Sequence, residues 1–208
     1  MPSKKEALWE AGREIVLAAP QLYVDVDLEA DGIAGFGSIL SIGMQSPTGE
    51  SFYSEVRPYD AKFIPGHRHF CEEHGLERDR LLREAPLLSD VVAQIQSWLT
   101  NLKELHGTSP VFTAFNASFD FSHVDLAFAL AGQYDRNPFG YAPFDLKSLA
   151  QPFSGTWDFR TTKKSALPTE IVPDGDFTHN ALEDAQYQQK LHFGMAALLG
   201  RTQYSLLI

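Results

Sequence analysis

The chain has one cysteine and no long apolar run. It also lacks an uninterrupted apolar stretch of signal-peptide length near its N-terminus. Because Cys71 is alone among 208 residues, no disulfide can form within the chain, and we expect a reducing, cytoplasmic setting. No stretch approaches the roughly 20 consecutive apolar residues that a membrane-spanning helix requires. Charged residues from Glu6 to Glu14 interrupt any signal-peptide core. We therefore expect a soluble protein with no membrane partner.

Basic residues are also scarce, since 17 Lys and Arg face 27 Asp and Glu, which gives a formal net charge of -10. This balance argues against a protein that holds long nucleic acid on a general basic surface, because neutralising phosphates takes clustered Lys and Arg. It leaves room for a small cleft that accepts one strand end. With 44% hydrophobic and 12% aromatic residues, the chain can bury one sizeable core, which predicts a single domain.

Apolar periodicity and turn residues divide the chain into strands and helices. Three strands in meander are followed by strands that alternate with helices, which is typical of a three-layer α/β domain on a mixed sheet. Residues 59–85 are expected to be irregular or to form short helices. The expected strands are 22–28, 38–45, 51–58 and 111–115, the expected helices are 4–18, 89–105, 118–132 and 180–199, and residues 141–150 should form a short strand and a helical turn.

The stretch VDVDLEADG places acidic residues on alternate positions of the first strand. Side chains two apart in a strand share a face, so Asp25, Asp27 and Glu29 should point the same way, about 6–7 Å apart. One explanation is a solvated acidic face. The strand is expected to be central, however, and buried carboxylates are unfavourable unless a positive partner meets them. The alternation therefore indicates a cation site.

Two further carboxylates begin helices farther along the chain. Asp120 follows the buried strand in AFNASFD, and Asp184 lies in THNALEDAQ, where Asn180 and Glu183 have the spacing of a capping box. Taken singly, an Asp in the first turn of a helix is already favoured by the helix dipole. His179 stands immediately before the cap, where a capping or surface role is the simplest explanation. Their order along the chain, rather than any one of them, points to a shared functional site.

The series D-x-E, then N-A-x-F-D, then H-x-A-x-x-D resembles the motifs of the DEDDh family of 3′-to-5′ exonucleases. The resemblance covers residues 21–199, so the chain is expected to be one exonuclease domain over 1–208, with a helical extension at 1–20. It implies a ribonuclease H-like fold with helices on both faces of a mixed five-stranded sheet. The chain departs from the family pattern at Ala30 and Asp31, which replace two threonines, and Asp25 is an extra carboxylate.

The resemblance also implies the roles of the motif residues. Asp27, Glu29, Asp120 and Asp184 would hold two Mg²⁺ or Mn²⁺ ions, and His179 would be the general base that activates water. This fits elementary chemistry, because hard divalent cations prefer carboxylate oxygens and two such ions can stabilise an in-line displacement at phosphorus. An imidazole pKa of about 6.5 suits proton abstraction near neutrality. The products would be nucleoside 5′-monophosphates.

Substrate contacts are expected just after the first motif and in a later loop. By the resemblance, Gly32 and Ile33 would hold the terminal nucleotide, while Phe121 or Phe36 would stack a base. The other explanation for Gly32 is a turn, and the preferred explanation for the two phenylalanines is a place in the core. The loop run FRTTKK contains three cations that suit phosphate contacts, unless the loop is simply solvated. These cations are Arg160, Lys163 and Lys164.

A second metal hypothesis concerns His67, His69, Cys71 and His74, whose spacing offers four zinc ligands. Four ligands within eight residues leave little chain to wrap a tetrahedral ion, so a surface helix is the competing explanation.

Three functional questions stay open at this point. The partner is expected to be the 3′ end of a single-stranded nucleic acid or a short oligonucleotide, either DNA or RNA. The alternatives to the exonuclease are a phosphodiesterase of dinucleotides or very short oligonucleotides and a non-catalytic binding or scaffold module of the same fold. The apolar C-terminal SLLI and the N-terminal helix leave a homodimer open.

Overall fold

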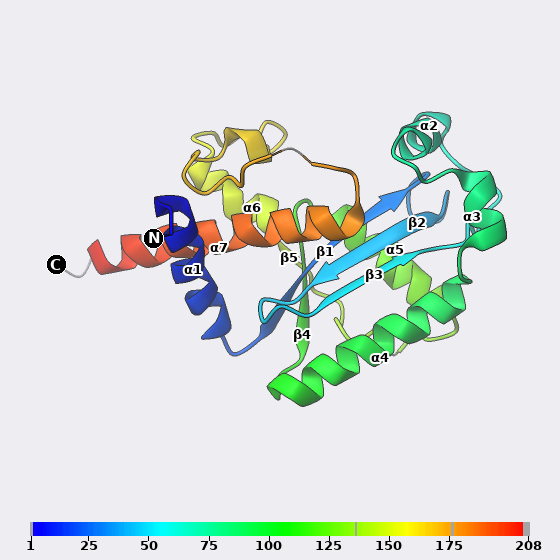
Figure 1. Cartoon of the computed structure of the whole chain (residues 1–208), viewed down its shortest axis with the longest axis horizontal. Helices are drawn as coiled ribbons and strands as arrows, with labels where there is room; N and C mark the ends of the chain where they lie inside the picture. Colours follow the sequence, from blue (N-terminus) through cyan, green and yellow to red (C-terminus); the bar gives the residue numbers. More distant parts are fainter. Residues whose placement is uncertain (1, 136, 176, 206–208) are drawn as a thin grey trace.

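The computed structural model describes residues 2–135, 137–175 and 177–205 and contains a mixed five-stranded sheet with helices on both faces (Figure 1). This confirms the predicted fold class. The strands are β1 Leu22–Ala30, β2 Ile39–Gln45, β3 Ser51–Glu55, β4 Pro110–Ala114 and β5 Phe144–Asp145. The helices are α1 Lys4–Leu17, α2 Pro65–Glu73, α3 Arg78–Glu84, α4 Leu88–His106, α5 Ser118–Leu130, α6 Leu146–Ala150 and α7 Ala181–Ser205, with short 3-10 turns η1 Gln151–Phe153 and η2 Lys164–Ala166.

The sheet has the order β3-β2-β1-β4-β5, so the acidic strand β1 is central. β2 runs antiparallel to β1, whereas β4 runs parallel to it, with Asp25 opposite Thr113. Because β1 and β4 are parallel, their carboxyl ends lie at the same edge of the sheet. The register between β1 and β2 shifts at Glu29 and Ala30, where a bulge re-aims the strand end. The acidic end of β1 therefore meets the turn that follows β4.

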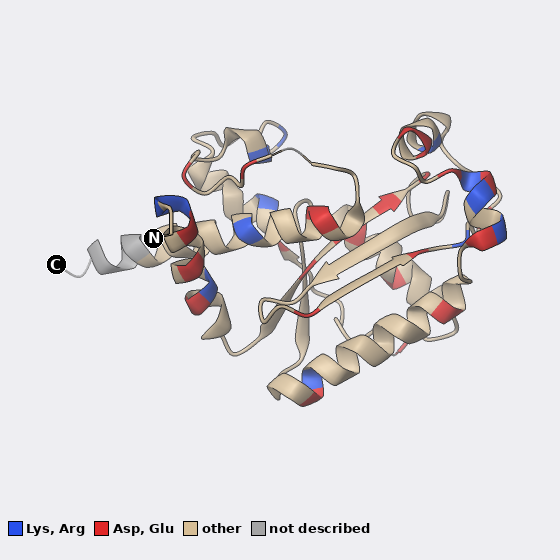
Figure 2. Cartoon of the chain, viewed as in Figure 1, with Lys and Arg blue, Asp and Glu red and all other residues tan. Residues whose placement is uncertain are grey.

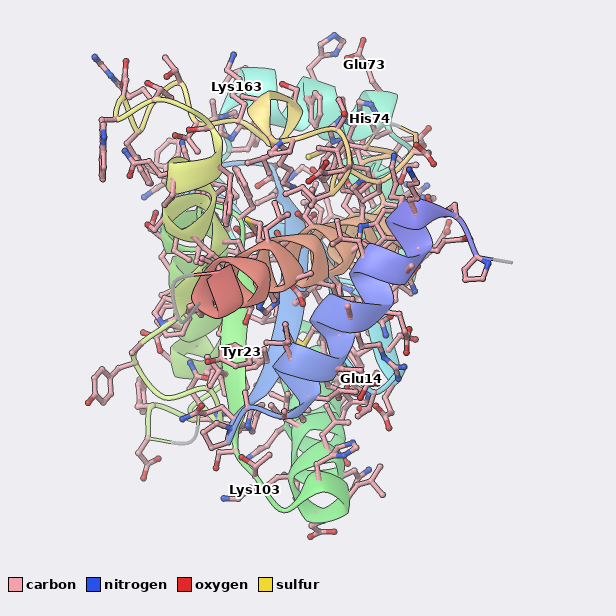
Figure 3. The ribbon with its side chains drawn as sticks, turned by 90° about the vertical axis from the view of Figure 1, so that its left-hand side faces the viewer. Glu14, Tyr23, Glu73, His74, Lys103 and Lys163 are labelled. Atoms are coloured by element: carbon pink, nitrogen blue, oxygen red, sulfur yellow. The ribbon has the colours of Figure 1, made fainter. Side chains whose placement is uncertain are left out.

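The two faces of β1 have different neighbours. Val24 and Val26 are fully buried in a core shared with residues of α4 and α5, and each such side chain stabilises the fold by about 1.5–3 kcal/mol. The acidic positions face the other side, where α7 packs on β1 and β2. Figure 3 shows α1 lying beside α7 on this side, where Leu8 of α1 is buried in a second core with Leu191 of α7. The alternation predicted for β1 is confirmed.

One glycine allows α7 to begin directly on the sheet. A Cβ added to Gly43 of β2 would overlap the backbone of Ala181 and Leu182. Only glycine therefore lets the first turn of α7 approach β2 this closely. The approach brings Asp184, in that turn, to the acidic end of β1.

The structure adds detail where the sequence was least informative. Residues 59–85 contain two short helices, α2 and α3, and the last helix continues to Ser205. Within the described residues, none of the helices combines the length and apolar character that crossing a lipid bilayer requires. Of the apolar C-terminal segment that left a homodimer open, residues 206–208 lie outside the described residues.

Candidate active site

All five residues of the predicted catalytic set line one cavity of about 790 Å³. Asp27 and Glu29 come from β1 and Asp120 from α5, while His179 comes from the loop just before α7 and Asp184 from its first turn. Glu29, His179 and Asp184 each present a ligand atom within 4.8 Å of the others, and among the described residues they are the only such group of three. The structure thus brings together three segments that are far apart in the sequence.

The start of α7 is folded around Asp184. Asn180 Oδ1 accepts hydrogen bonds from two backbone N–H groups of the first turn, at 3.1 and 3.2 Å, as an N-cap does. Glu183 does not complete the predicted capping box, since the Asn180 N–H donates to Thr178 Oγ1 at 3.3 Å. The Asp184 carboxylate accepts from the backbone N–H groups of Thr178 and His179, at 3.0 and 3.1 Å. These hydrogen bonds fix the position of the His179 backbone beside Asp184.

The turn before Asp120 is held by a residue that the sequence did not single out. Asp145 Oδ1 accepts hydrogen bonds from the backbone N–H groups of Asn116 and Ala117, at 2.9 and 3.1 Å. Asn116 adopts a left-handed backbone with φ of 70°, which asparagine tolerates better than most residues. Asp145 also caps α6, and that N-cap position was its only sequence signal. Asp120 is consequently placed in the first turn of α5, with 7% of its surface exposed.

Burial and mutual repulsion raise the pKa values of the site carboxylates. Burial raises the pKa of Glu29 to about 8, and the charges of Asp27 and Asp184 add to the effect. Burial likewise raises the pKa of Asp27, of Asp120 and of Asp184. A cation would remove this penalty, and an all-oxygen carboxylate set is what Mg²⁺ and Mn²⁺ prefer. The donor set therefore fits hard divalent ions.

A lysine enters the same cavity from the loop before α7. Lys164 Nζ lies 3.6 Å from the ring centroid of Phe177 and 5.3 Å from that of Phe115. Burial lowers the pKa of Lys164, while the carboxylates, Asp27 foremost, oppose this change. Lys163 and Arg160 line the cavity too, so all three predicted cations reach it. Figure 2 shows basic residues on this loop and acidic residues on α7 and on β1.

Gly32 and Ile33, predicted to hold the terminal nucleotide, are not among the residues that line this cavity. A Cβ on Gly32 would overlap the Phe36 carbonyl oxygen, so the turn explanation for Gly32 accounts for its position. Ile33 and Phe36 exchange two backbone hydrogen bonds, of 3.1 and 2.8 Å, and both side chains are exposed.

Phe119 takes the place that the sequence assigned to Phe121. Phe121 packs edge-on against Phe112 in the core, with ring centroids 5.2 Å apart. Phe121 is therefore a core residue, which was the alternative to its stacking role. Phe119 lines the catalytic cavity and also a second cavity of about 380 Å³. The two cavities share Leu28 and Glu29 as well, so they are neighbours. The second cavity is otherwise lined by Ala30, Gly66, His67 and Phe70.

The two unusual carboxylates of the first motif are structural in this fold. Asp31 is fully buried, pairs with Arg78 of α3, and accepts a hydrogen bond from the Ser38 N–H at 2.7 Å. It anchors the glycine-rich turn to α3 and does not line either cavity. Asp25 is buried beneath the site, where Gln188 Nε2 lies 3.4 Å and His192 Nδ1 3.5 Å from its oxygens.

The zinc hypothesis for the His-rich helix is wrong. Cys71 points into a small core, with its Sγ 3.5 Å from the Ala30 carbonyl oxygen. His69 pairs with Glu73 at 3.4 Å, and His74 packs against His179. His67 lines the second cavity. These four side chains form no metal-ligand group in the described part of the chain.

Comparisons with known proteins agree with this geometry. No protein-family profile matches the chain. The 3′-5′ DNA exonuclease Cap18 of Escherichia coli is 33% identical over 175 residues, which cover 82% of this chain and 89% of that protein. The nuclease domain of 3′hExo, a DEDDh family member bound to rAMP, superposes with a TM-score of 0.64 at 17% identity, over 86% of this chain and 92% of that one. Exonuclease I of E. coli with a dT13 oligonucleotide gives 0.62 at 15% identity, over 90% of this chain and 42% of that one.

The mixed five-stranded sheet of this domain, with carboxylates at the end of its central strand, matches the ribonuclease H-like fold of the DEDDh nucleases. The structural likenesses, at this identity, establish the fold. The Cap18 relationship goes further because it covers most of both chains. The chain belongs to the DEDDh family of 3′-5′ exonucleases.

Proposed function

We propose that this exonuclease uses divalent metal ions to release nucleoside 5′-monophosphates from the 3′ end of single-stranded DNA. The observation that carries the proposal is the convergence of Asp27, Glu29, Asp120, His179 and Asp184 on one cavity. DNA is favoured over RNA by the similarity to a DNA exonuclease over most of the chain.

The four carboxylates would hold two Mg²⁺ or Mn²⁺ ions. When bound, these ions supply the positive charge that stabilises the attacking and leaving oxygens of an in-line displacement. His179 acts as the general base toward water. Its Nδ1 lies 3.5 Å from Glu29 Oε1, so a proton at Nδ1 leaves Nε2 free to accept one. Burial and the neighbouring His74 lower the pKa of His179, which keeps the imidazole neutral and able to act as a base near neutral pH.

The strand end is held on both sides of the carboxylates. The base of the terminal nucleotide enters the second cavity, where Phe70 and Phe119 offer apolar walls. Upstream phosphates contact Arg160 and Lys163 on the loop before α7. Trp157 of the same loop, 89% exposed, is available to stack an upstream base. A clustered cationic loop of this kind supports binding of a strand in spite of the net charge of -10.

We take residues 1–208 as one exonuclease domain, with 21–199 as its catalytic core. A homodimer stays a prediction. The apolar side of α1 does not need a partner subunit to cover it, because Leu8 and Val16 are buried within the chain itself.

The proposal is tested with 5′-labelled single-stranded DNA, the matching RNA and a dinucleotide, each incubated with Mg²⁺ or Mn²⁺. The expected result is a ladder of successively shorter DNA products that requires metal and is lost in Asp27→Asn and His179→Gln. Asp125→Asn is a matched control, since Asp125 lies exposed on the same helix as Asp120. Cleavage of the dinucleotide alone would support the short-substrate phosphodiesterase instead. Absence of any cleavage would leave the scaffold module, whereas equal cleavage by the variants would contradict catalysis at this site.

A further inference from the structure

Three aromatic rings meet at the edge of the active site. The ring centroid of His179 lies 4.5 Å from that of Phe70 and 4.4 Å from that of His74, and Phe70 and His74 are themselves 4.5 Å apart. Each pair is tilted or edge-to-face, the arrangement that aromatic rings prefer. The three rings therefore pack as a mutual cluster around the proposed general base.

The sequence of α2 places two of these rings on one face. Phe70 and His74 are four residues apart at the C-terminal end of the helix, and residues at this spacing are neighbours on a helix surface. His74 Nδ1 lies 2.7 Å from the Phe70 carbonyl oxygen, which fixes the orientation of the His74 ring. Figure 3 labels His74 and Lys163 along the same upper edge of the molecule. The end of α2 and the cationic loop thus lie at the same edge.

The His179 side chain needs such support, because the hydrogen bond from its N–H to Asp184 holds the backbone and does not orient the imidazole. His179 has φ of 58°, a left-handed conformation that is unfavourable for a residue with a Cβ. Such conformations persist only where surrounding contacts determine them. A third of its side chain is exposed, and the nearest carboxylate oxygen, Glu29 Oε1, is 3.5 Å away, too far for a strong hydrogen bond. The rings of α2 are the packing contacts that define where the imidazole points.

We propose that His74, together with Phe70, is a positioning residue for His179 in the exonuclease reaction. The proposal rests on the function proposed above, in which His179 takes the proton from water. Displacing a catalytic group by about 1 Å can lower a rate by about 100-fold. The edge contacts of His74 restrain the ring against displacements of this size.

The two α2 residues are expected to differ in what they affect. Phe70 lines the second cavity, where the terminal base is proposed to bind, whereas His74 lines neither cavity. Loss of the His74 ring should therefore lower kcat and leave KM nearly unchanged. Loss of the Phe70 ring should change both kcat and KM. A purely structural role for α2 would not produce this split between the two residues.

The experiment compares His74→Ala, His74→Phe and Phe70→Ala with a matched control, His69→Ala. His69 lies on the same helix, its side chain is 74% exposed, and it contacts Glu73 away from His179. We expect His74→Ala to lower kcat by about tenfold or more, but by less than the about 100- to 10,000-fold that the general base itself contributes, with KM within about twofold. His74→Phe keeps a ring at the contact and should recover most of kcat, and His69→Ala should match the wild type.

An NMR measurement of the His179 ring protons separates this proposal from the proposed function. In the metal-free protein, the ring currents of Phe70 and His74 should displace these resonances, and His74→Ala should move them while His69→Ala does not. An inactive wild-type enzyme that shows this displacement contradicts the proposed function alone. An active enzyme whose kcat is equal in His74→Ala and wild type, or is not recovered in His74→Phe, overturns the positioning role.

Discussion

Replacing Glu29 by glutamine is expected to stabilise the metal-free protein and to abolish its response to divalent metal. Burial raises the pKa of Glu29 from 4.5 to about 8, and Asp27 and Asp184 contribute further. A raised folded-state pKa means that the folded protein binds the proton more tightly than the unfolded chain does. The stability associated with this group is therefore complete below about pH 4.5 and is lost as the pH rises through about 8.

The size of the effect follows from this change in pKa. At about pH 7 the linkage relation gives a penalty of about 3 kcal/mol for Glu29, and at about pH 5 only about 1 kcal/mol. The carboxylate side chain is 12% exposed, so solvent screening removes only part of this energy. Glutamine has the same shape and no charge to bury. For a chain of this length, about 3 kcal/mol corresponds to a rise in melting temperature of about 6–12 °C.

The assay is thermal unfolding of wild type and Glu29→Gln with a chelator and with Mg²⁺ or Mn²⁺, at about pH 5 and about pH 7. The expected gain of the variant without metal is larger at the higher pH. With metal, the wild type should gain stability and the variant should gain much less. A variant that is less stable at both pH values, or a gain that does not depend on pH, would refute the reasoning.

Three further predictions concern His179, Lys164 and Arg78. His179→Ala should lower kcat by about 100- to 10,000-fold and keep the metal-dependent rise in melting temperature; loss of that rise would make His179 a ligand. Lys164→Met should tighten Mg²⁺ binding by about tenfold in a calorimetric titration, because removing about 1.4 kcal/mol of repulsion has that effect. Weaker binding would contradict the electrostatic interaction between its ammonium group and the carboxylates. Arg78→Met should destabilise the fold by about 3–5 kcal/mol in denaturant unfolding, because it leaves Asp31 buried and unpaired; an unchanged midpoint would show that the pair contributes little.

Much of the site could be predicted from the sequence because its motifs are local. Asp27 and Glu29 share a strand face through simple alternation, and the apolar residues between them identify the buried side. Asp120 follows a buried strand, and Asp184 follows the N-cap residue Asn180. The convergence of these residues depends on tertiary structure. It could still be predicted, because the order of the motifs resembles that of a known family.

The contacts that the sequence missed are those that depend on packing between elements. Phe119 and Phe121 are the same residue type on the same helix, so the sequence does not distinguish them. Only the rotation of α5 on β4 decides which one faces the cavity. The role of Asp31 depends on Arg78, which lies 47 positions away in a region with weak periodicity. The spacing of His74 along the helix alone offered only a zinc ligand or a surface-helix residue. The actual partner of His74 is His179, more than a hundred residues later in the chain.

Anomalous diffraction from crystals grown with Mn²⁺ tests the central claim most directly. The account predicts anomalous density in the catalytic cavity, between the carboxylates of Asp27, Glu29, Asp120 and Asp184. Density only at another place, such as the histidines of α2, or a cavity that takes up no ion at saturating Mn²⁺, would contradict it.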